Sequence, residues 1–349
     1  MKIGIITFHW ATNYGAVLQA YALSKYLTNI GAEARIINYY PKRYKKNIIN
    51  AFKTRHISSI PGRIKEISKE KQIASFRERQ LNMTQYYSTN RQLLNSDFKF
   101  DCYMCGSDQI WNESFLMGGE RKKTYSYFLN FAPDDKTIAS YAASFGTMQY
   151  NEHLKTDLKK YLSRFDFISV RENSGINILH DVGIDNACVV PDPTMLLTKE
   201  AYEKFVIGNS RNYKYNFVYM LHGKLNDISD IIDYLHQKGE STEISANEGI
   251  EEWLSNIYYA EHIITNSFHG IVFSIIFQRP FTAVLIDGSG MNDRIITLLD
   301  KFELSDRIYR NNKEISEKAI DWKQTEYKLK EYRDVGIKYI SEILKYHKK

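Results

Sequence analysis

The sequence predicts an α/β protein of two Rossmann-like domains, and three observations support this fold class. Short apolar segments alternate with segments of helical periodicity along most of the 349 residues. Apolar segments run into polar loops that precede helices, which is the pattern of parallel sheets whose loops carry function. A Pro-Asp-Pro stop at residues 191–193 divides the alternation into two series. We therefore expect two domains that face each other, with a ligand site in the cleft beyond the carboxyl ends of the strands.

The first series opens with a strand–helix–strand unit. Residues 2–8 are mostly apolar, apolar residues recur at helical spacing over 16–27, and residues 34–39 predict a second strand. No Gly-x-Gly-x-x-Gly fingerprint follows the first strand, so the sequence disfavours a dinucleotide ligand. Further strands are expected at 98–104, 137–143, 165–170 and 187–190, and further helices at 154–162 and from 171.

The second series begins after the Pro-Asp-Pro stop. We place the first domain at residues 1–194 and the second at residues 195–325. The terminal segment 326–349 carries apolar side chains on one helical face, and we expect it to pack back across the domains; a membrane-surface helix is the alternative. The second domain is expected to contain strands at 216–221, 262–265 and 281–286, and helices at 225–238, 250–258, 269–277 and 293–302.

Positive charge is concentrated in residues 42–79. The whole chain has a net charge of +6, whereas this stretch holds 12 Lys or Arg and 3 Glu, a net charge of 12 − 3 = +9. We expect this basic insert to interrupt the α/β pattern and to lie against anionic lipid headgroups or a lipid-linked diphosphate. A solvated helical excursion accounts for the same charges equally well. Nucleic acid is disfavoured as a partner because no recognition motif accompanies the charge.

Several features favour a cytoplasmic protein without a metal centre. No run approaches the roughly 20 apolar residues of a membrane span, and the first residues predict a strand rather than a signal peptide. Three cysteines give no disulfide framework. Cys102 and Cys105 have the spacing of a redox or metal pair, but residues i and i+3 of a strand point to opposite faces. We therefore expect no metal ion, and at most peripheral contact with the inner face of the membrane.

The turn at residues 263–270 is the strongest candidate for a ligand site. A buried strand ends at Asn266 and Ser267, and a helix is expected to begin near Gly270. These two side chains can cap the helix, whose free amides and dipole favour an anion. His269 lies at this turn and can exchange protons near neutral pH. The alternative is an ordinary capped helix in which His269 is satisfied by a neighbour.

Five segments resemble motifs of the polysaccharide pyruvyl transferase family. The resemblance runs from residue 1 to about residue 300 and does not cover the chain beyond Arg307. Each motif alone has low specificity, but five motifs in the same order are fairly specific. They are FHWATNYGAVLQAYAL at 8–23, GSDQIWN at 106–112, SVRE at 169–172, VPDPT at 190–194 and TNSFHG at 265–270.

The resemblance implies a GT-B-like fold and the transfer of pyruvate from phosphoenolpyruvate to a sugar, often as a 4,6-ketal. It implies a place in bacterial cell-surface or capsular polysaccharide biosynthesis, no cofactor, and a lipid-linked oligosaccharide as acceptor. The family's conserved His falls on His269, and its Arg after the middle strand falls on Arg171. Many members carry Arg at the position of Ser267; here Arg294 could supply that cationic contact, or the donor could bind in a different pose.

The expected chemistry matches these residue types. Phosphoenolpyruvate is highly anionic, so its site needs guanidinium groups and helix N-termini rather than a metal. Ketal formation adds a proton to the methylene carbon and a sugar hydroxyl to C2, which suits His269 as acid/base and Arg171 as the anion anchor. Asp108 could be a base for the sugar hydroxyl or a loop cap, and His9 a second acid or a packed side chain. The predicted catalytic residues are therefore His269, Arg171 and Asp108. Substrate contacts are expected from His9, Asn13, Tyr14, Gly15, Ser107, Gln109, Asn266, Ser267 and Arg294.

Two other functions are compatible with the same fold. A GT-B glycosyltransferase with a nucleotide-sugar donor would also place a histidine at the cleft, although the C-terminal half shows no obvious ribose-binding carboxylate pattern. A non-catalytic, sugar-binding member of a polysaccharide assembly complex is the other alternative. The presence of both His269 and Arg171 argues against it, because a protein without catalytic activity has no need of them.

Overall fold

The computed structural model divides the chain into two compact units. It describes residues 1–44, 60–116, 123–208, 213–221, 228–237, 240–245, 248–309, 315–316 and 318–348. Unit 1 comprises Met1–Leu196 together with Tyr332–Lys349, and unit 2 comprises Leu197–Glu331. The last residues of the chain therefore return to unit 1.

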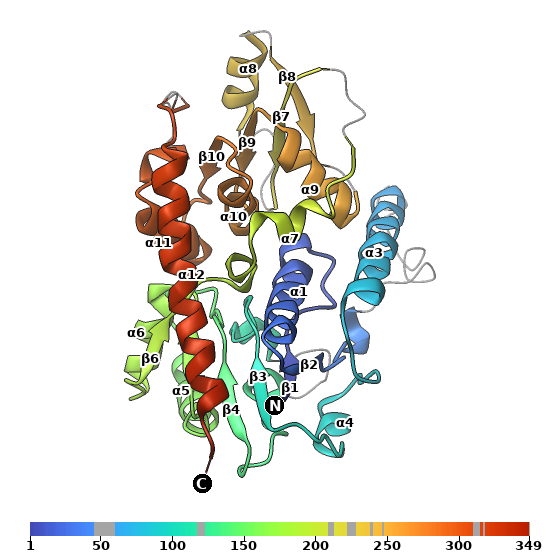
Figure 1. The fold of residues 1–349 in the computed structure, drawn as a ribbon, viewed down its shortest axis with the longest axis vertical. Coiled ribbons are helices and arrows are strands. Elements are labelled where there is room, and N and C mark those ends of the chain that lie inside the picture. Colours follow the sequence, from blue (N-terminus) through green and yellow to red (C-terminus); the bar gives the residue numbers. More distant parts are fainter. Residues whose placement is uncertain are drawn as a thin grey trace. The chain divides into compact units, whose positions relative to one another are not determined.

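Unit 1 is built around a parallel sheet (Figure 1). Strands β1 and β3 are at its centre, in the order β2-β1-β3-β4, and they are buried on both faces, as expected where helices cover both sides of a sheet. Strands β5 and β6 pair with each other, and bridges from Ala139 to Phe167 and from Ala143 to Val170 continue the sheet from β4 to β5. The strands are β1 (Lys2–Ile6), β2 (Glu33–Ile36), β3 (Cys102–Cys105), β4 (Thr137–Ser140), β5 (Ile168–Val170) and β6 (Ala187–Val189).

The helices of unit 1 connect these strands. The longest of those that follow a strand directly is α1, which begins at Tyr14 just after the polar loop that ends β1. The α-helices are α1 (Tyr14–Asn29), α3 (Ile60–Gln80), α4 (Asn90–Leu94), α5 (Glu152–Leu162) and α6 (Asn173–Asp181). Short 3₁₀ turns lie at η1 (Lys42–Tyr44), η3 (Glu113–Phe115), η4 (Ser126–Phe128) and η5 (Pro193–Leu196).

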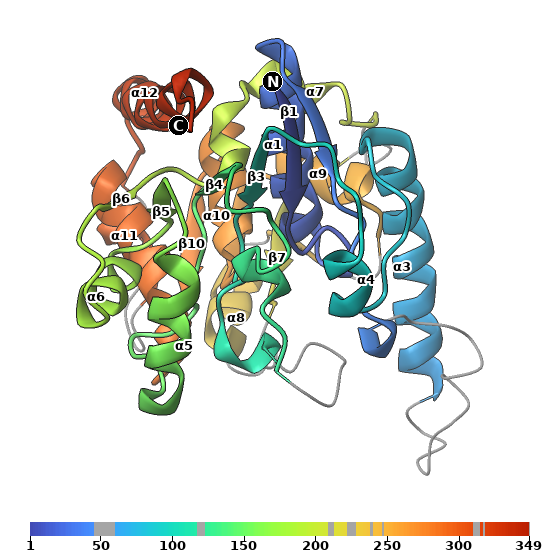
Figure 2. The ribbon, with the colours of Figure 1, turned by 90° about the horizontal axis from the view of Figure 1, so that it is seen from below.

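Part of the basic stretch 42–79 belongs to the fold of unit 1. Helix α3 lies beside α1 (Figures 1 and 2), and the Phe76 ring contacts Tyr21 with centroids 6.0 Å apart. Arg77 is 6% exposed and donates a 2.8 Å hydrogen bond from Nη1 to the carbonyl of Trp10. It also pairs with the buried Glu70. The stretch was expected to interrupt the α/β pattern as a charged insert, but α3 packs into unit 1, and a buried Arg77 cannot contact lipid. Residues 45–59 lie outside the described residues.

Unit 2 contains a second parallel sheet, in the order β11-β10-β9-β7-β8. Two edge strands, β8 and β11, were not predicted; β8 has the half-polar sequence Ser-Thr-Glu-Ile and β11 has two residues, so neither shows an apolar strand pattern. The strands are β7 (Tyr215–Tyr219), β8 (Ser241–Ile244), β9 (His262–Thr265), β10 (Phe281–Val284) and β11 (Ile308–Tyr309). The helices are α7 (Lys199–Glu203), α8 (Ser229–Gln237), α9 (Ile250–Tyr259), α10 (Phe268–Ile276) and α11 (Asp293–Phe302), with 3₁₀ turns η7 (Gly290–Asn292) and η8 (Ser305–Arg307).

The last helix, α12 (Trp322–Lys345), begins in unit 2 and ends in unit 1. In unit 1 the Tyr339 hydroxyl donates a 2.9 Å hydrogen bond to the carbonyl of Ser140. Gly336 is required here, because a Cβ at this position would lie 2.3 Å from the Tyr141 hydroxyl. The apolar face predicted for this helix therefore packs on unit 1 over its last turns. Among the described residues, no helix has the length and apolar character needed to cross a bilayer.

Candidate active site

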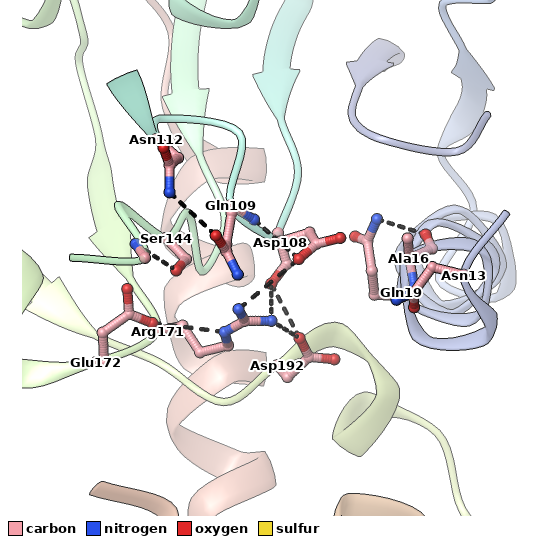
Figure 3. Close-up of polar contacts among 12 residues, drawn as sticks. Asn13, Ala16, Gln19, Asp108, Gln109, Asn112, Ser144, Arg171, Glu172 and Asp192 are labelled. Atoms are coloured by element: carbon pink, nitrogen blue, oxygen red, sulfur yellow. Dashed lines mark hydrogen bonds and ion pairs between the residues drawn. The ribbon is translucent and has the colours of Figure 1, made fainter. Parts of the chain in front are cut away.

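Arg171 occupies a buried, acidic position at the carboxyl end of β5 (Figure 3). Its Nη1 lies 2.9 Å from Asp192 Oδ2, its Nε 3.5 Å from Glu172 Oε2 and its Nη2 3.9 Å from Asp108 Oδ1. Burial opposes the charge of the guanidinium, but the three carboxylates raise the pKa of Arg171 above its usual value. One cation faces three carboxylates, so this group has a formal charge of −2 when all are ionised. That charge disfavours the predicted role of Arg171 as the anchor of a highly anionic donor.

Asp192 holds Arg171 in place. The Asp192 side chain is fully buried, and its Oδ2 accepts a 3.0 Å hydrogen bond from Ser107 Oγ in addition to the ion pair. Its Oδ1 accepts from the backbone N of Thr194 at 3.0 Å and from Thr194 Oγ1 at 2.7 Å. All lone pairs of this carboxylate are therefore directed at fixed partners. Ser107, predicted to contact substrate, takes part in this network.

Asp108 is the carboxylate of this group that a ligand can reach. Its side chain is 18% exposed, against 0% for Asp192 and 3% for Glu172. Its backbone has φ of +73°, in the left-handed region that residues other than glycine adopt at a cost. Asp108 Oδ1 accepts a 2.9 Å hydrogen bond from the backbone N of Gln109, which is the loop-capping contact considered for it. A capped carboxylate with a partly exposed side chain can serve both as a loop cap and as a base.

Gln109 is fixed within the same loop. Its Oε1 accepts a 3.1 Å hydrogen bond from Asn112 Nδ2. Gly146 lies against it with φ of +64°, and a Cβ there would be 2.4 Å from Gln109 Oε1. The Ser144 hydroxyl accepts from the backbone N of Gly146 at 3.2 Å. These contacts close the loops that follow β3 and β4 around Gln109.

The loop after β1 places His9 inside unit 1. The His9 ring is 1% exposed, with Nδ1 3.1 Å from the Thr7 carbonyl and Nε2 3.1 Å from Asn38 Oδ1. The pKa of His9 is lowered to about 4, mainly by burial and to a smaller extent by nearby Arg77. The two hydrogen bonds of the ring act in the opposite direction and raise the pKa, but they do not offset burial. The ring is therefore neutral at pH 7, and each of its nitrogens lies beside a polar group of unit 1. This environment favours packing over the acid role considered for His9.

The start of α1 contains three predicted contact residues. Asn13 is the N-cap, and its side chain accepts a 3.1 Å hydrogen bond from the backbone N of Ala16; Tyr14 and Gly15 form the buried first turn. One turn later Gln19 donates from Nε2 to the Ala16 carbonyl and to Thr7, both at 2.8 Å. Figure 3 shows Asn13, Ala16 and Gln19 together at this end of α1.

In unit 2, the turn after β9 has the predicted cap. Ser267 is the N-cap of α10, and its Oγ accepts a 3.2 Å hydrogen bond from the backbone N of Gly270. Gly270 is needed because a Cβ there would lie 2.7 Å from Thr265 Oγ1. Asn266 accepts a 2.7 Å hydrogen bond from the backbone N of Leu221, which ties the turn to the end of β7. His269, 7% exposed, lies in the first turn of α10, which begins two residues earlier than the predicted Gly270.

Arg294 lies at the same end of the unit 2 sheet as His269. Strands β9 and β10 are parallel neighbours, and α10 and α11 follow their carboxyl ends. Arg294 is the second residue of α11 and is 7% exposed. A buried carboxylate, Glu248, also follows the carboxyl end of a strand, β8, and accepts a hydrogen bond from Ser245. This edge therefore combines a helix N-terminus and a guanidinium with the buried carboxylate of Glu248, and Asp293 precedes Arg294 in α11.

The family model of polysaccharide pyruvyl transferases matches residues 13–288 of the chain. The chain belongs to the polysaccharide pyruvyl transferase family. The match includes the positions of Asp108, Arg171, Asp192 and His269, whereas His9 and Arg294 lie outside it.

Likeness to a solved structure with a TM-score above 0.5 places this pyruvyl transferase family member in the predicted GT-B-like fold class. A UDP-GlcNAc 2-epimerase from Neisseria meningitidis, bound to UDP-GlcNAc, is 9% identical, with 99% of each chain covered and a TM-score of 0.51. The UDP-GlcNAc 2-epimerase of Methanocaldococcus jannaschii is 12% identical over 100% of this chain and 94% of that one, with a TM-score of 0.46. The glycosyltransferase SnogD from Streptomyces nogalater is 10% identical over 98% and 95%, with a TM-score of 0.39. No curated protein matches the chain.

Sequence reasoning missed four polar residues of this pyruvyl transferase family member. Asp192 and Glu172 lie within quoted motifs, but their sequence positions do not show that both approach Arg171. Gln19 occurs in the first motif, within the predicted helix, but was not chosen as a site residue. Glu248 has no sequence signal, because its strand β8 was not predicted. Among the described residues, no three His, Cys, Asp or Glu side chains are grouped so that they could hold a metal ion.

Proposed function

We propose that this member of the pyruvyl transferase family transfers pyruvate from phosphoenolpyruvate to two hydroxyls of a sugar, forming a ketal. The acceptor is a lipid-linked oligosaccharide of bacterial cell-surface or capsular polysaccharide biosynthesis. The observation that carries this proposal is the family match over residues 13–288, within which His269 lies on the first turn of a capped helix.

The donor binds through unit 2. Its phosphate and carboxylate need positive potential, and the N-terminal dipole of α10 and the guanidinium of Arg294 supply it at one edge of the sheet. Many family members carry Arg where this chain has Ser267, and here Ser267 instead caps the helix. Arg294 then takes the place of that arginine.

His269 is the acid/base of the transfer. It gives a proton to the methylene carbon of phosphoenolpyruvate, which becomes the methyl group of the product, and the first sugar hydroxyl adds to C2. The C2–O bond to phosphate then breaks, inorganic phosphate leaves, and a second hydroxyl closes the ketal ring at C2. Each hydroxyl loses one proton. The net reaction converts phosphoenolpyruvate and a diol into a ketal and phosphate.

Asp108 accepts a proton from a sugar hydroxyl, and Arg171 acts by orienting Asp108. The 3.9 Å separation of Arg171 Nη2 and Asp108 Oδ1, together with the 2.9 Å pair with Asp192, supports this assignment over direct donor binding. A neutral hydroxyl suits the acidic surroundings of Arg171 better than a phosphate does.

The enzyme works in the cytoplasm, where the basic residues of 42–79 other than the buried Arg77 contact anionic lipid at the inner face of the membrane. Neutralising four lysines of this stretch should weaken binding to anionic vesicles, with a salt dependence, and should not affect turnover of a soluble acceptor. Flotation with vesicles of anionic and neutral phospholipid measures this; equal binding of the variant and the parent chain to anionic vesicles would exclude the contact.

A thermal-shift experiment separates the proposed function from its alternatives. Phosphoenolpyruvate at saturating concentration should raise the melting temperature, because a ligand that binds the folded state stabilises it. UDP-sugars should leave it unchanged. Stabilisation by UDP-sugars alone would instead support a glycosyltransferase, and stabilisation by neither donor would support a non-catalytic sugar-binding protein.

A further inference from the structure

A cavity lies in unit 2, at the opposite end of its strands from His269. Its volume is about 520 Å³, within the range of small-molecule pockets. The residues that line it lie at or just before the starts of β7 to β11, in α8, or between β11 and α12. His269 and Arg294 follow the carboxyl ends of β9 and β10, so this cavity at the amino ends is separate from the proposed donor site.

The cavity wall includes a buried arginine that is only partly neutralised. Arg307 is 4% exposed. Its Nη1 donates a 3.1 Å hydrogen bond to the carbonyl of Ser316, and its Nη2 donates to that of Lys318. Of the carboxylates that the structure describes, Asp306 pairs with Arg307, 3.4 Å from Nη2, and its side chain is 38% exposed. Within the described part of the chain, Arg307 Nε–H has no acceptor.

Asn216 offers the complementary group. It is 2% exposed, and its Nδ2 donates a 2.6 Å hydrogen bond to Glu240 Oε2. Its Oδ1 accepts no hydrogen bond from the described residues. A buried donor and a buried acceptor without partners are rare in folded proteins and are usually satisfied by a ligand or an ordered water.

The charges of the cavity select for a monoanion. Among the described residues that line it, three are cations, Lys214, Lys318 and Arg307, and two are carboxylates, Glu240 and Glu261, which gives 3 − 2 = +1. Lys214 and Glu261 also pair with each other at 3.4 Å. A phosphate monoester carries nearly two negative charges at pH 7 and matches this balance less well than a carboxylate does.

A histidine in the wall adds polarity without charge. His262 Nε2 lies 2.8 Å from Thr282 Oγ1. Burial, and then the nearby Arg307, lower the pKa of His262 to about 4, so the ring is neutral at pH 7. The remaining wall is partly apolar, with Leu235, Pro280 and Ile315.

We propose that this cavity binds a small hydroxylated carboxylic acid, such as a sugar acid, that the enzyme does not consume. The carboxylate accepts from Arg307 Nε–H, and a hydroxyl donates to Asn216 Oδ1. The carbon skeleton lies against the apolar wall. This combination uses both orphaned buried groups and the net charge of +1.

Calorimetric titration of the full chain with D-glucuronate tests the proposal, with D-glucose and glucose 1-phosphate as neutral and dianionic comparisons. We expect saturable binding of glucuronate at one site, and weaker binding of both comparison sugars. Asn216→Ala should weaken glucuronate binding about tenfold, because it removes the acceptor for the ligand hydroxyl. His269→Ala should leave this binding unchanged.

A charge variant keeps the test decisive if Asn216→Ala fails to fold. Ser241 is exposed and lines the cavity, so Ser241→Asp lowers the net charge to zero and should also weaken glucuronate binding. Ser229→Asp, at the exposed start of α8 and outside the cavity lining, is the matched control and should bind normally.

The absence of saturable glucuronate binding up to about 10 mM would overturn the proposal and leave ordered water as the occupant. So would binding that is lost in His269→Ala but retained in Ser241→Asp. Neither readout involves pyruvyl transfer, so failure of the proposed enzymatic function would not affect them.

Discussion

The carboxyl ends of the strands present different charged groups in the two units. In unit 1, the guanidinium of Arg171 is surrounded by three carboxylates. In unit 2, the corresponding edge presents the N-terminus of α10 and the buried Arg294, together with the buried carboxylate Glu248. Open α/β sheets bind ligands beyond the carboxyl ends of their strands, and both candidate sites lie there. The fold therefore determines where a site lies, whereas the charges around each side chain determine which ligand it binds.

Within the proposed function, this difference assigns the anionic donor to unit 2 and a neutral sugar hydroxyl to Asp108 in unit 1. In the sequence, Arg171 lies in a family motif and was therefore assigned to binding the anionic donor. In the structure, its Nη1 already donates a hydrogen bond to Asp192. Four experiments test this difference between the two units.

The largest effect is expected for Asp192→Ala, which removes the buried partner of Arg171. The free energy of unfolding should fall by about 3–5 kcal/mol, because the guanidinium then remains buried without its closest counter-charge. Urea denaturation followed by circular dichroism measures this change. The control is Asp185→Ala on the surface of unit 1, where little change is expected. A loss below about 1 kcal/mol would mean that Asp192 does not hold Arg171.

His269→Ala should lower the turnover number about a hundredfold or more, with a smaller effect on donor binding, because the variant lacks the group that protonates the donor. Phosphate release from phosphoenolpyruvate with an accepted sugar measures turnover. His180→Ala, an exposed histidine in unit 1, is the control. Near-normal turnover of His269→Ala would remove this turn from the catalytic site.

Paired arginine variants test the charge comparison directly. Arg294→Gln should weaken phosphoenolpyruvate binding about tenfold, because a charged hydrogen bond to the donor is lost. Arg171→Gln should chiefly lower turnover, and Arg171→Lys should restore it only in part, because the lysine lacks the guanidinium fork. Donor affinity and turnover are measured separately, by titration and by initial rates. If Arg171→Gln impaired donor affinity more than Arg294→Gln did, the donor would belong to unit 1.

The smallest effect concerns His9 and the pH dependence of stability. The folded-state pKa of His9 is about 4, below the ordinary value of 6.5, so its contribution is complete above pH 6.5 and is lost as the pH falls toward 4. Between pH 7 and pH 6 this amounts to about 0.7 kcal/mol of unfolding free energy. His9→Gln should make the stability less dependent on pH in this range, as followed by urea denaturation. An unchanged pH dependence would mean that His9 has the same pKa in the folded and the unfolded protein.

The sequence was sufficient for the parts of the fold whose signals are local. The strand, polar turn and helix around His269 were predicted because apolar periodicity and capping residues lie within ten residues of one another. The family resemblance added the GT-B-like fold class. Strands β8 and β11 were missed because edge strands of four and two residues have little apolar pattern.

The chemistry of the site was less predictable because it depends on contacts between distant residues. Arg171 and Asp192 are 21 residues apart, and His9 and Asn38 are 29 apart, so neither pair can be inferred from spacing. The burial of a side chain also depends on residues distant in the sequence. His9 belongs to a polar loop, and nothing in that loop's sequence indicates that the ring is buried. The motifs were therefore sufficient to predict which residues are candidates for the site. Their ionisation states and hydrogen-bond partners could be determined only from the structure.

The return of α12 to unit 1 has a consequence for the order of events during protein synthesis. Unit 1 lacks Tyr332–Lys349 until these residues have left the ribosome, although Met1–Leu196 emerge much earlier. The nascent unit 1 therefore exposes the apolar surface around Tyr141 while Leu197–Glu331 are translated and can fold as a unit. Unit 2 is thus expected to reach its native state before the unit that begins the chain. A ribosome stalled shortly after residue 331 should display a unit 1 that proteases cleave readily.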